Sequence, residues 1–348
     1  MTRPLIACLG AGRMGRGIAV AFAYAGHEVR LVDVKERDGA GFRDLQSAAL
    51  AEVRATFASL AGLGLFDPSA VDQLSSRIGV VPASGRRAAL SEASIIFEGV
   101  PEILEHKREV LADASALAQP DAIIASTTST IMVDDMAGAV AGPERFLNAH
   151  WLNPAYLVPL VEVSPGGKTD PAVTERLKAL LEGIGKVPVV CKSSPGFIVP
   201  RIQALAMNEA ARMVEEGVAS AEEIDKAIRV GFGFRFAVLG LLEFIDWGGG
   251  DILFHASRYL EGALGNERYR APEVIHRNME EGRIGLRTGQ GFLDYAGLDV
   301  VAYRNERLAA FIGLSRHLGL SRAPELDPNS PSCCDGEGSP VARKAQRT

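Results

Sequence analysis

A histidine and a glutamate flank a proline-containing turn in the middle of the chain. His150 stands in the stretch 148–154, and Glu162 follows in the extended run 158–163. Two extended runs joined by such a turn can bring the carboxylate of Glu162 back beside the imidazole of His150. A histidine held by a carboxylate has a fixed tautomer and can act as a general base. The pattern therefore indicates a site for general-base catalysis.

A glycine-rich turn follows the first apolar run of the chain. Residues 4–9 are too few for a helix and are typical of a buried parallel strand, and Gly10-Ala11-Gly12-Arg13-Met14-Gly15 comes directly after them. Gly10 would permit the tight turn, Gly12 would let a pyrophosphate approach the backbone, and Gly15 would let helix and strand pack closely. We therefore expect a dinucleotide at the N-terminal end of the next helix.

An acidic residue ends the second predicted strand. Val29–Val32 leads into Asp33, where a carboxylate can accept hydrogen bonds from ribose hydroxyls. The order strand, glycines, helix, strand, acid is far more specific than the glycine motif alone. Asp33 would repel a 2′-phosphate, so the sequence favours NAD over NADP. Lys35 and Arg37 lie close by in the chain and weaken that preference.

The composition excludes several classes of protein. The 348 residues suffice for two domains, and the net charge of -6 argues against a nucleic-acid partner. No apolar run approaches the ~20 residues of a membrane span, and the first predicted strand leaves no room for a signal peptide. The four cysteines have no zinc spacing and imply neither a metal site nor a disulfide framework. We therefore expect a cytoplasmic protein without a membrane partner.

Strands and helices alternate through the first part of the chain. Six further strands are predicted at residues 78–81, 95–98, 122–125, 145–148, 158–163 and 186–190. This alternation is typical of a doubly wound sheet. A helical hairpin over about 39–75, with its turn near 62–64, is expected as an insertion after the second strand.

The pattern becomes helical after Ser193. Residues 202–214 have helical periodicity, and Ser220-Ala221-Glu222-Glu223 is typical of a capping box that starts a helix running to about Val230. We predict an α/β fold: a Rossmann-type domain over 1–193, then an all-α C-terminal domain over 194–320. The remaining segment, 321–348, lacks periodicity and is expected to be disordered.

Several motifs together resemble the L-3-hydroxyacyl-CoA dehydrogenase family over about residues 4 to 312. They are the glycine motif, Val100-Pro101-Glu102 with Lys107, Ser126-Thr127-Thr128-Ser129, and His150-Trp151-Leu152-Asn153-Pro154 with Glu162. Pro195-Gly196-Phe197-Ile198-Val199 and Arg287-Thr288-Gly289-Gln290-Gly291-Phe292 add support. The resemblance implies NAD as cofactor, a small-molecule 3-hydroxyacyl substrate and a homodimer formed through the helical domain.

The resemblance also implies roles for the matching residues. Four would serve catalysis: His150 as base, Glu162 to orient it, Ser129 to hold the substrate hydroxyl, and Asn153 beside the nicotinamide. Glu102 and Lys107 would contact the cofactor, together with Gly10, Gly12, Arg13, Met14, Gly15 and Asp33.

Three of these residues also have a structural interpretation. Glu102 could serve a helix dipole, Lys107 could lie on a solvated helix face, and Ser129 could cap a helix. Trp151, beside the histidine, could line the substrate pocket or fill the core.

Three departures from the family concern the substrate. Pro200 replaces the usual asparagine, which removes a side chain thought to help hold the substrate carbonyl. Between Asp38 and Val71 only Arg43 and Arg54 are basic, which suits the phosphates of coenzyme A poorly. In Phe232-Gly233-Phe234-Arg235-Phe236-Ala237 the chain resembles the branch of carnitine dehydrogenase, gulonate dehydrogenase and lambda-crystallin. Arg235 could clamp a free carboxylate, or it could be an ordinary surface residue.

The sequence thus predicts an NAD-dependent dehydrogenase that interconverts an L-3-hydroxyacyl compound and its 3-keto form. The substrate is either a 3-hydroxyacyl-CoA of fatty acid metabolism, such as 3-hydroxybutyryl-CoA, or a free 3-hydroxy carboxylate. A non-catalytic NAD-binding protein of crystallin type is the alternative from another class. A 6-phosphogluconate-type dehydrogenase is disfavoured, because that group uses a lysine where this chain has the histidine and glutamate.

Overall fold

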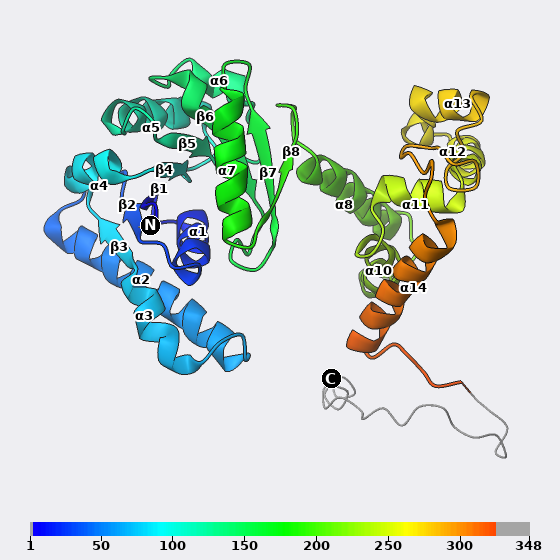
Figure 1. Ribbon diagram of the computed structural model, residues 1–348, viewed down its shortest axis with the longest axis horizontal. Helices are drawn as coiled ribbons and strands as arrows, with labels where there is room; N and C mark the ends of the chain where they lie inside the picture. Colours follow the sequence, from blue (N-terminus) through cyan, green and yellow to red (C-terminus); the bar gives the residue numbers. More distant parts are fainter. Residues whose placement is uncertain (1–2, 325–348) are drawn as a thin grey trace. The chain divides into compact units, whose positions relative to one another are not determined.

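The computed structural model describes residues 3–324, which divide after Glu209 into two compact units (Figure 1). The division falls inside one long helix, further along the chain than the predicted boundary near Ser193, which stays a prediction. From residue 325 onward, the segment predicted to be disordered lies outside the described residues. Within the described part, no helix is both long and apolar enough to cross a membrane.

An eight-stranded sheet organises the first unit, with strand order β3-β2-β1-β4-β5-β6-β7-β8. The strands are β1 (Ile6–Leu9), β2 (Val29–Val32), β3 (Ile78–Val81), β4 (Ile95–Glu98), β5 (Ile123–Ser126), β6 (Phe146–Trp151), β7 (Leu160–Pro165) and β8 (Val187–Val190). All neighbouring strands pair in parallel except β6 and β7, which are antiparallel. This arrangement confirms the predicted Rossmann-type fold.

Helices cover both faces of the sheet. Successive side chains of β1 point to opposite faces, and each face needs apolar partners. Ile6 packs in a cluster with Phe22 of α1 (Arg13–Tyr24). Leu9 faces the other way and packs with Leu90 and Ala114, from α4 (Arg86–Glu92) and α5 (Leu104–Leu117). Both faces of the central strand are thus buried, as its uninterrupted apolar run predicts. This unit also contains the 3-10 turn η2 (Ala83–Gly85), α6 (Val133–Ala137), the 3-10 turn η3 (Pro143–Arg145) and α7 (Pro171–Gly183).

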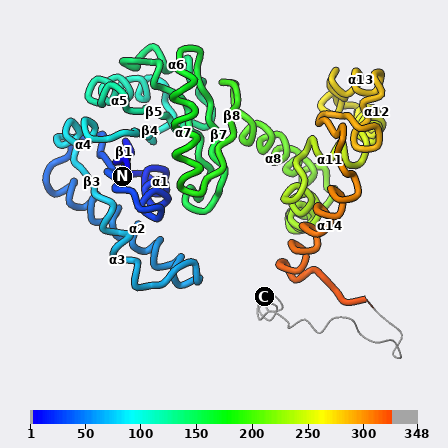
Figure 2. Tube along the Cα trace, in the orientation of Figure 1, coloured from blue at the N-terminus to red at the C-terminus, as the bar shows by residue number. Residues whose placement is uncertain are grey.

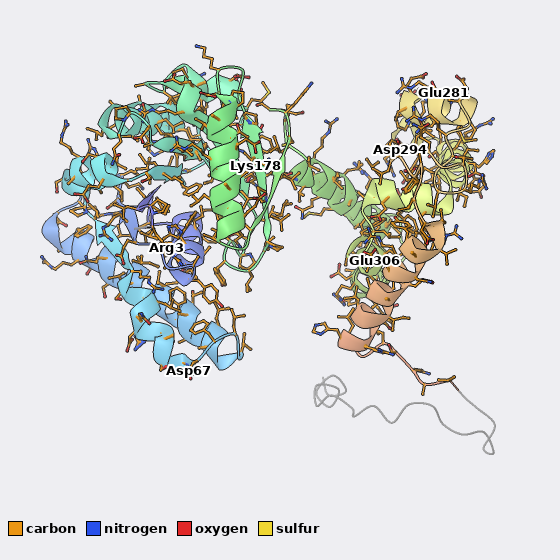
Figure 3. The ribbon with its side chains drawn as sticks, in the orientation of Figure 1. Arg3, Asp67, Lys178, Glu281, Asp294 and Glu306 are labelled. Carbon is orange, nitrogen blue, oxygen red and sulfur yellow. The ribbon has the colours of Figure 1, made fainter. Side chains whose placement is uncertain are left out.

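The segment inserted after β2 forms two helices that lie side by side (Figure 2). They are α2 (Gly39–Gly62) and α3 (Val71–Ser76), joined through the 3-10 turn η1 (Pro68–Ala70). Asp67, labelled in Figure 3, starts that turn by accepting a hydrogen bond from the amide of Ser69. Val53 and Phe57 of α2 are buried in the same cluster as residues of α1, so the insertion shares the hydrophobic core of α1 and the sheet.

The second unit is helical, as predicted. Helix α8 (Val199–Glu215) leads into α9 (Ala221–Ala227), which Ser220 caps through the amide of Glu223. Beyond Ala227 the chain continues as a π-helical turn instead of the α-helix expected to reach about Val230. The other segments are that turn, η4 (Ile228–Phe232), and α10 (Gly233–Phe236), α11 (Leu241–Gly248), α12 (Gly250–Leu264), η5 (Glu267–Tyr269), α13 (Glu273–Glu280) and α14 (Val300–His317).

Candidate active site

The antiparallel pairing of β6 and β7 places Glu162 directly opposite His150. The Nδ1 atom of His150 lies 2.7 Å from the Oε2 atom of Glu162, and both side chains are buried. An ionised carboxylate only accepts hydrogen bonds, so Nδ1 carries the proton and Nε2 of the neutral ring is left with a free lone pair. The arrangement expected from the sequence is present, and it leaves a base with one defined reactive atom.

The second oxygen of Glu162 is held by the start of α8. Its Oε1 atom accepts hydrogen bonds from the amides of Ile198 at 2.9 Å and Val199 at 2.8 Å. Burial alone would raise the pKa of Glu162, but the hydrogen bonds from His150 and these two amides outweigh it and lower the pKa. Glu162 is therefore ionised at neutral pH and can stabilise an imidazolium.

Phe197 covers the imidazole of His150. The two rings are stacked with their centroids 6.0 Å apart and an angle of 27° between their planes. Phe197 is the only described non-glycine residue with a positive φ, 44°, which is a strained conformation that tends to occur at functional sites. The sequence interpretation missed this role. The Pro195-Gly196 pair before Phe197 marks a turn, but it does not indicate which ring the turn would cover.

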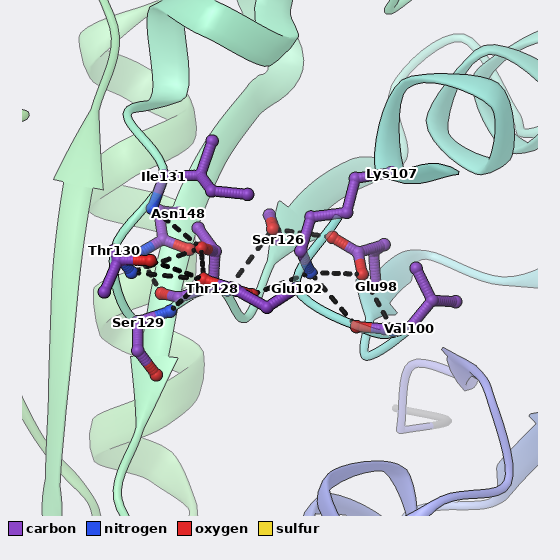
Figure 4. A network of polar contacts seen from close by, with 10 residues as sticks. All are labelled: Glu98, Val100, Glu102, Lys107, Ser126, Thr128, Ser129, Thr130, Ile131 and Asn148. Carbon is purple, nitrogen blue, oxygen red and sulfur yellow. Dashed lines mark hydrogen bonds and ion pairs between the residues drawn. The ribbon is translucent and has the colours of Figure 1, made fainter. Parts of the chain in front are cut away.

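A buried ion pair lies at the carboxyl end of β4 (Figure 4). The Nζ atom of Lys107 is 2.8 Å from Oε1 of Glu98 and donates also to the carbonyl of Val100, while the hydroxyl of Ser126 donates to Oε2 of Glu98 at 2.6 Å. Glu98 is 0% exposed and Lys107 is 1% exposed. The interpretation of Lys107 as a solvated helix face is therefore wrong. Glu98 itself was missed, although a carboxylate at the end of an apolar strand was a signal.

Glu102 binds the loop after β5. Its Oε1 atom accepts hydrogen bonds from the amides of Ser129 and Thr130, at 3.1 and 3.2 Å, and from the hydroxyls of Thr128 and Thr130. Its Oε2 atom is 3.4 Å from Nζ of Lys107. Burial would raise the pKa of Glu102, but these hydrogen bonds and the Lys107 charge lower it. Glu102 thus serves the Ser129 loop directly rather than a helix dipole.

Ser129 presents its hydroxyl outside this network. Its side chain is exposed and points away from the other labelled residues in Figure 4. Helix α6 begins at Val133 with Met132 at its N-cap, so the interpretation of Ser129 as a helix cap is wrong. The loop therefore fixes the backbone of Ser129 through Glu102 and leaves its hydroxyl free for a ligand.

The glycine turn fits a dinucleotide. Gly10 has a φ of +97°, and a Cβ atom on Gly15 would lie 2.1 Å from the carbonyl oxygen of Gly10. A Cβ atom on Gly12 would meet nothing within 4 Å, which leaves open space at the start of α1. Gly12 is the N-cap of α1 and supplies no side-chain cap, so the first amides of the helix are available to a phosphate. Arg13 is exposed at this end, whereas Met14 packs against the core.

The same substitution by alanine should have different effects at Gly15 and at Gly12. Gly15→Ala should lower the melting temperature, because its Cβ atom would force the β1–α1 turn apart. Gly12→Ala should leave the melting temperature within about 2 °C of the wild type and weaken NAD binding about tenfold or more, because the methyl group occupies the phosphate space. Thermal unfolding and calorimetric titration with NAD separate the two. Equal NAD affinities of Gly12→Ala and the wild type would contradict this assignment.

Asp33 and Asn153 lie in different parts of the first unit. Asp33 follows β2, where its carboxylate accepts hydrogen bonds from Nε of Arg37 at 2.6 Å and the amide of Lys35 at 3.1 Å. Asn153 is exposed in the turn after β6 and lines a cavity of about 270 Å³ together with Arg13 of the glycine motif. The fold thus brings the expected nicotinamide-side residue close to the glycine turn.

Trp151 and Arg235, both considered as substrate-binding residues, have different surroundings in the structure. Trp151 is buried against Phe22 and Phe97, with centroids 6.0 and 5.8 Å away, so it fills the core. Arg235 belongs to the second unit and is exposed. Its guanidinium lies 5.0 Å from the ring centroid of Phe244, and no carboxylate among residues 3–324 forms an ion pair with it.

Two family models match the chain in succession. The NAD binding domain of 3-hydroxyacyl-CoA dehydrogenase matches residues 5–194, and the C-terminal domain of the same enzyme matches residues 196–295. The chain belongs to the 3-hydroxyacyl-CoA dehydrogenase family. This membership confirms the predicted resemblance and NAD as the cofactor of this NAD-dependent dehydrogenase.

Relatives in the 3-hydroxyacyl-CoA dehydrogenase family are named for different substrates. A 5-formyl-3-hydroxy-2-methylpyridine 4-carboxylate 5-dehydrogenase from Mesorhizobium japonicum is 30% identical over 90% of this chain and 97% of its own. A 3-hydroxybutyryl-CoA dehydrogenase from Bradyrhizobium diazoefficiens is 33% identical over 86% of this chain and 98% of its own. The crystal structure of 3-hydroxyacyl-CoA dehydrogenase from Archaeoglobus fulgidus superposes with a TM-score of 0.71 at 33% identity, covering 92% of this chain and all of that one.

Proposed function

We propose that this chain interconverts an L-3-hydroxyacyl compound and its 3-keto form, with 3-hydroxybutyryl-CoA as the first candidate substrate. The observation that carries the proposal is the buried pair of His150 and Glu162, 2.7 Å apart, in a chain with a complete nucleotide-binding turn. A general base of defined tautomer beside a hydride acceptor is what the oxidation of a secondary alcohol requires.

Four residues of the first unit each have one role in this reaction. Bound NAD would supply the acceptor for the hydride of the carbinol carbon. Nε2 of His150 takes the hydroxyl proton, since Nδ1 already donates to Glu162. Glu162 keeps its charge and stabilises the imidazolium that forms. The hydroxyl of Ser129 donates a hydrogen bond to the substrate oxygen, and Asn153 orients the nicotinamide.

A free 3-hydroxy carboxylate is the second candidate substrate. Arg235 is exposed and has no acidic partner among the described residues, so its charge is available to a carboxylate. Pro200, in the first turn of α8, offers no side-chain donor to a thioester carbonyl. One relative from Mesorhizobium japonicum is named for a substrate that carries a carboxylate.

The substitution Arg235→Gln separates the two substrate classes. We expect the wild type to reduce NAD with L-3-hydroxybutyryl-CoA, and Arg235→Gln to leave kcat/KM for this thioester within about threefold. If a free acid is the substrate, the variant should instead lose about tenfold or more in kcat/KM for 3-hydroxybutyrate, carnitine or gulonate, because a bidentate contact is lost. Arg258→Gln, which removes a charge from another exposed arginine above a phenylalanine ring, is the matched control.

We also propose that the protein is cytoplasmic. We further propose that it acts as a homodimer, because the helical domain of the family pairs subunits. The mass in solution by light scattering tests the dimer, and the mass of a single chain would exclude it.

The rival proposal of a crystallin-type NAD-binding protein predicts NAD binding without turnover of any substrate. The presence of Ser129, His150, Asn153 and Glu162 together supports catalysis.

A further inference from the structure

The carboxylate expected to bind the adenosine ribose already carries a cation. Nε of Arg37 lies 2.6 Å from Oδ2 of Asp33, and the amide of Lys35 donates to Oδ1. The side chain of Asp33 is 6% exposed, whereas that of Arg37 is 34% exposed. At this distance the arginine neutralises much of the negative charge that would repel a 2′-phosphate.

Only one nitrogen of Arg37, Nε, binds Asp33. Within the part of the chain that the structure describes, its two terminal nitrogens have no hydrogen-bond partner, and the ammonium of Lys35 has neither a hydrogen bond nor an ion pair. The nearby Glu36 does not compete for them, since it pairs with Arg86 at 3.2 Å. Two exposed cations are therefore available beside the ribose-binding carboxylate.

These groups share a small pocket. Its polar lining residues are Asp33, Lys35, Arg37, the exposed Ser84 and Glu36, the last of which pairs with Arg86, and Phe42 is an apolar neighbour. A guanidinium, an ammonium and a hydroxyl are donors of the kind that bind phosphate monoesters. Their position after the second strand of a Rossmann fold is where an arginine accommodates the 2′-phosphate of NADP.

We propose that this chain accepts NADP as well as NAD, and that Arg37 determines how well. With NAD, the ribose hydroxyls donate to Asp33, which Arg37 holds in place. With NADP, the terminal nitrogens of Arg37 bind the 2′-phosphate, and Lys35 and Ser84 provide further donors. This dual specificity depends on the nucleotide site alone and not on the proposed substrate.

Calorimetric titration of the full chain with NAD and with NADP tests the proposal without any turnover. We expect both to bind, and Arg37→Gln to raise the ratio of the NADP to the NAD dissociation constant about tenfold, because a charge-assisted contact to the phosphate is lost. Asp33→Asn should lower the same ratio, since the remaining repulsion disappears. Arg54→Gln is the charge-matched control: Arg54 pairs with Asp72 and does not line the pocket, so the ratio should not change.

Two results would overturn the proposal. One is that the wild type binds NAD but shows no measurable binding of NADP. The other is that Arg37→Gln weakens both nucleotides equally, which would make Arg37 a support for Asp33 and nothing more. Because no substrate is present, neither result depends on whether the substrate is a thioester or a free acid.

Discussion

Replacing His150 by glutamine should lower kcat for alcohol oxidation by about 10²–10⁴-fold, the usual contribution of a general base. The dissociation constant for NAD should change by less than about threefold, because this side chain is not among the residues expected to hold the nucleotide. The reason is specific to the geometry: Nδ1 is occupied by Glu162, so only Nε2 can take the proton. Steady-state formation of NADH and a binding titration measure the two quantities.

Two other variants sharpen this experiment. Glu162→Gln keeps a hydrogen-bonding side chain but removes the charge that stabilises the imidazolium, so kcat should fall while NAD binding persists. His106→Gln removes a partly exposed histidine of α5, 3.8 Å from Glu109, and should leave kcat unchanged. A His150→Gln enzyme that keeps its kcat within about threefold would remove His150 from the mechanism.

Replacing Lys107 by methionine should destabilise the first unit by about 3–5 kcal/mol, the cost of leaving one partner of a buried ion pair uncompensated. Glu98 is 0% exposed and would be left with only the Ser126 hydroxyl and the Val100 amide. The chain has two tryptophans, Trp151 in the core of the first unit and Trp247 in the second. In a Trp247→Phe background, urea unfolding followed by fluorescence therefore reports on the first unit.

A surface lysine serves as the control for this prediction. Lys178→Met breaks a pair with Glu175 on the exposed side of α7, where Lys178 is labelled in Figure 3, and should cost no more than about 1 kcal/mol. The double variant Glu98→Gln with Lys107→Met should recover much of the loss, since no fully buried charge is left unpaired. If Lys107→Met unfolds at the same urea concentration as Lys178→Met, the buried pair does not stabilise the fold.

The sheet and the central pair of the site could be predicted because their signals are local. Short apolar runs between turn residues are typical of strands, and each predicted strand overlaps an observed one. The proline-containing turn between His150 and Glu162 allowed only a short connection, so two facing strands followed. The glycine spacing reflects sterics within a single turn, as the contact between Gly15 and Gly10 demonstrates.

The remaining contacts of the site leave no pattern in the spacing of residues along the chain. Phe197 reaches His150 only because the amides after it bind the free oxygen of Glu162. Glu98 acquires its partners from α5 and β5, which a strand pattern cannot reveal. The surface interpretation of Lys107 was wrong for the same reason: the helix face that looks polar in sequence is turned toward a buried carboxylate.

The most direct test of the account is the formation of NADH by the wild-type chain with L-3-hydroxybutyryl-CoA, and in parallel with free 3-hydroxybutyrate, carnitine and gulonate. The account predicts turnover of at least one of these hydroxy compounds, with the loss of that turnover in His150→Gln. Binding of NAD without NADH formation from any of them would contradict it and would favour the non-catalytic alternative.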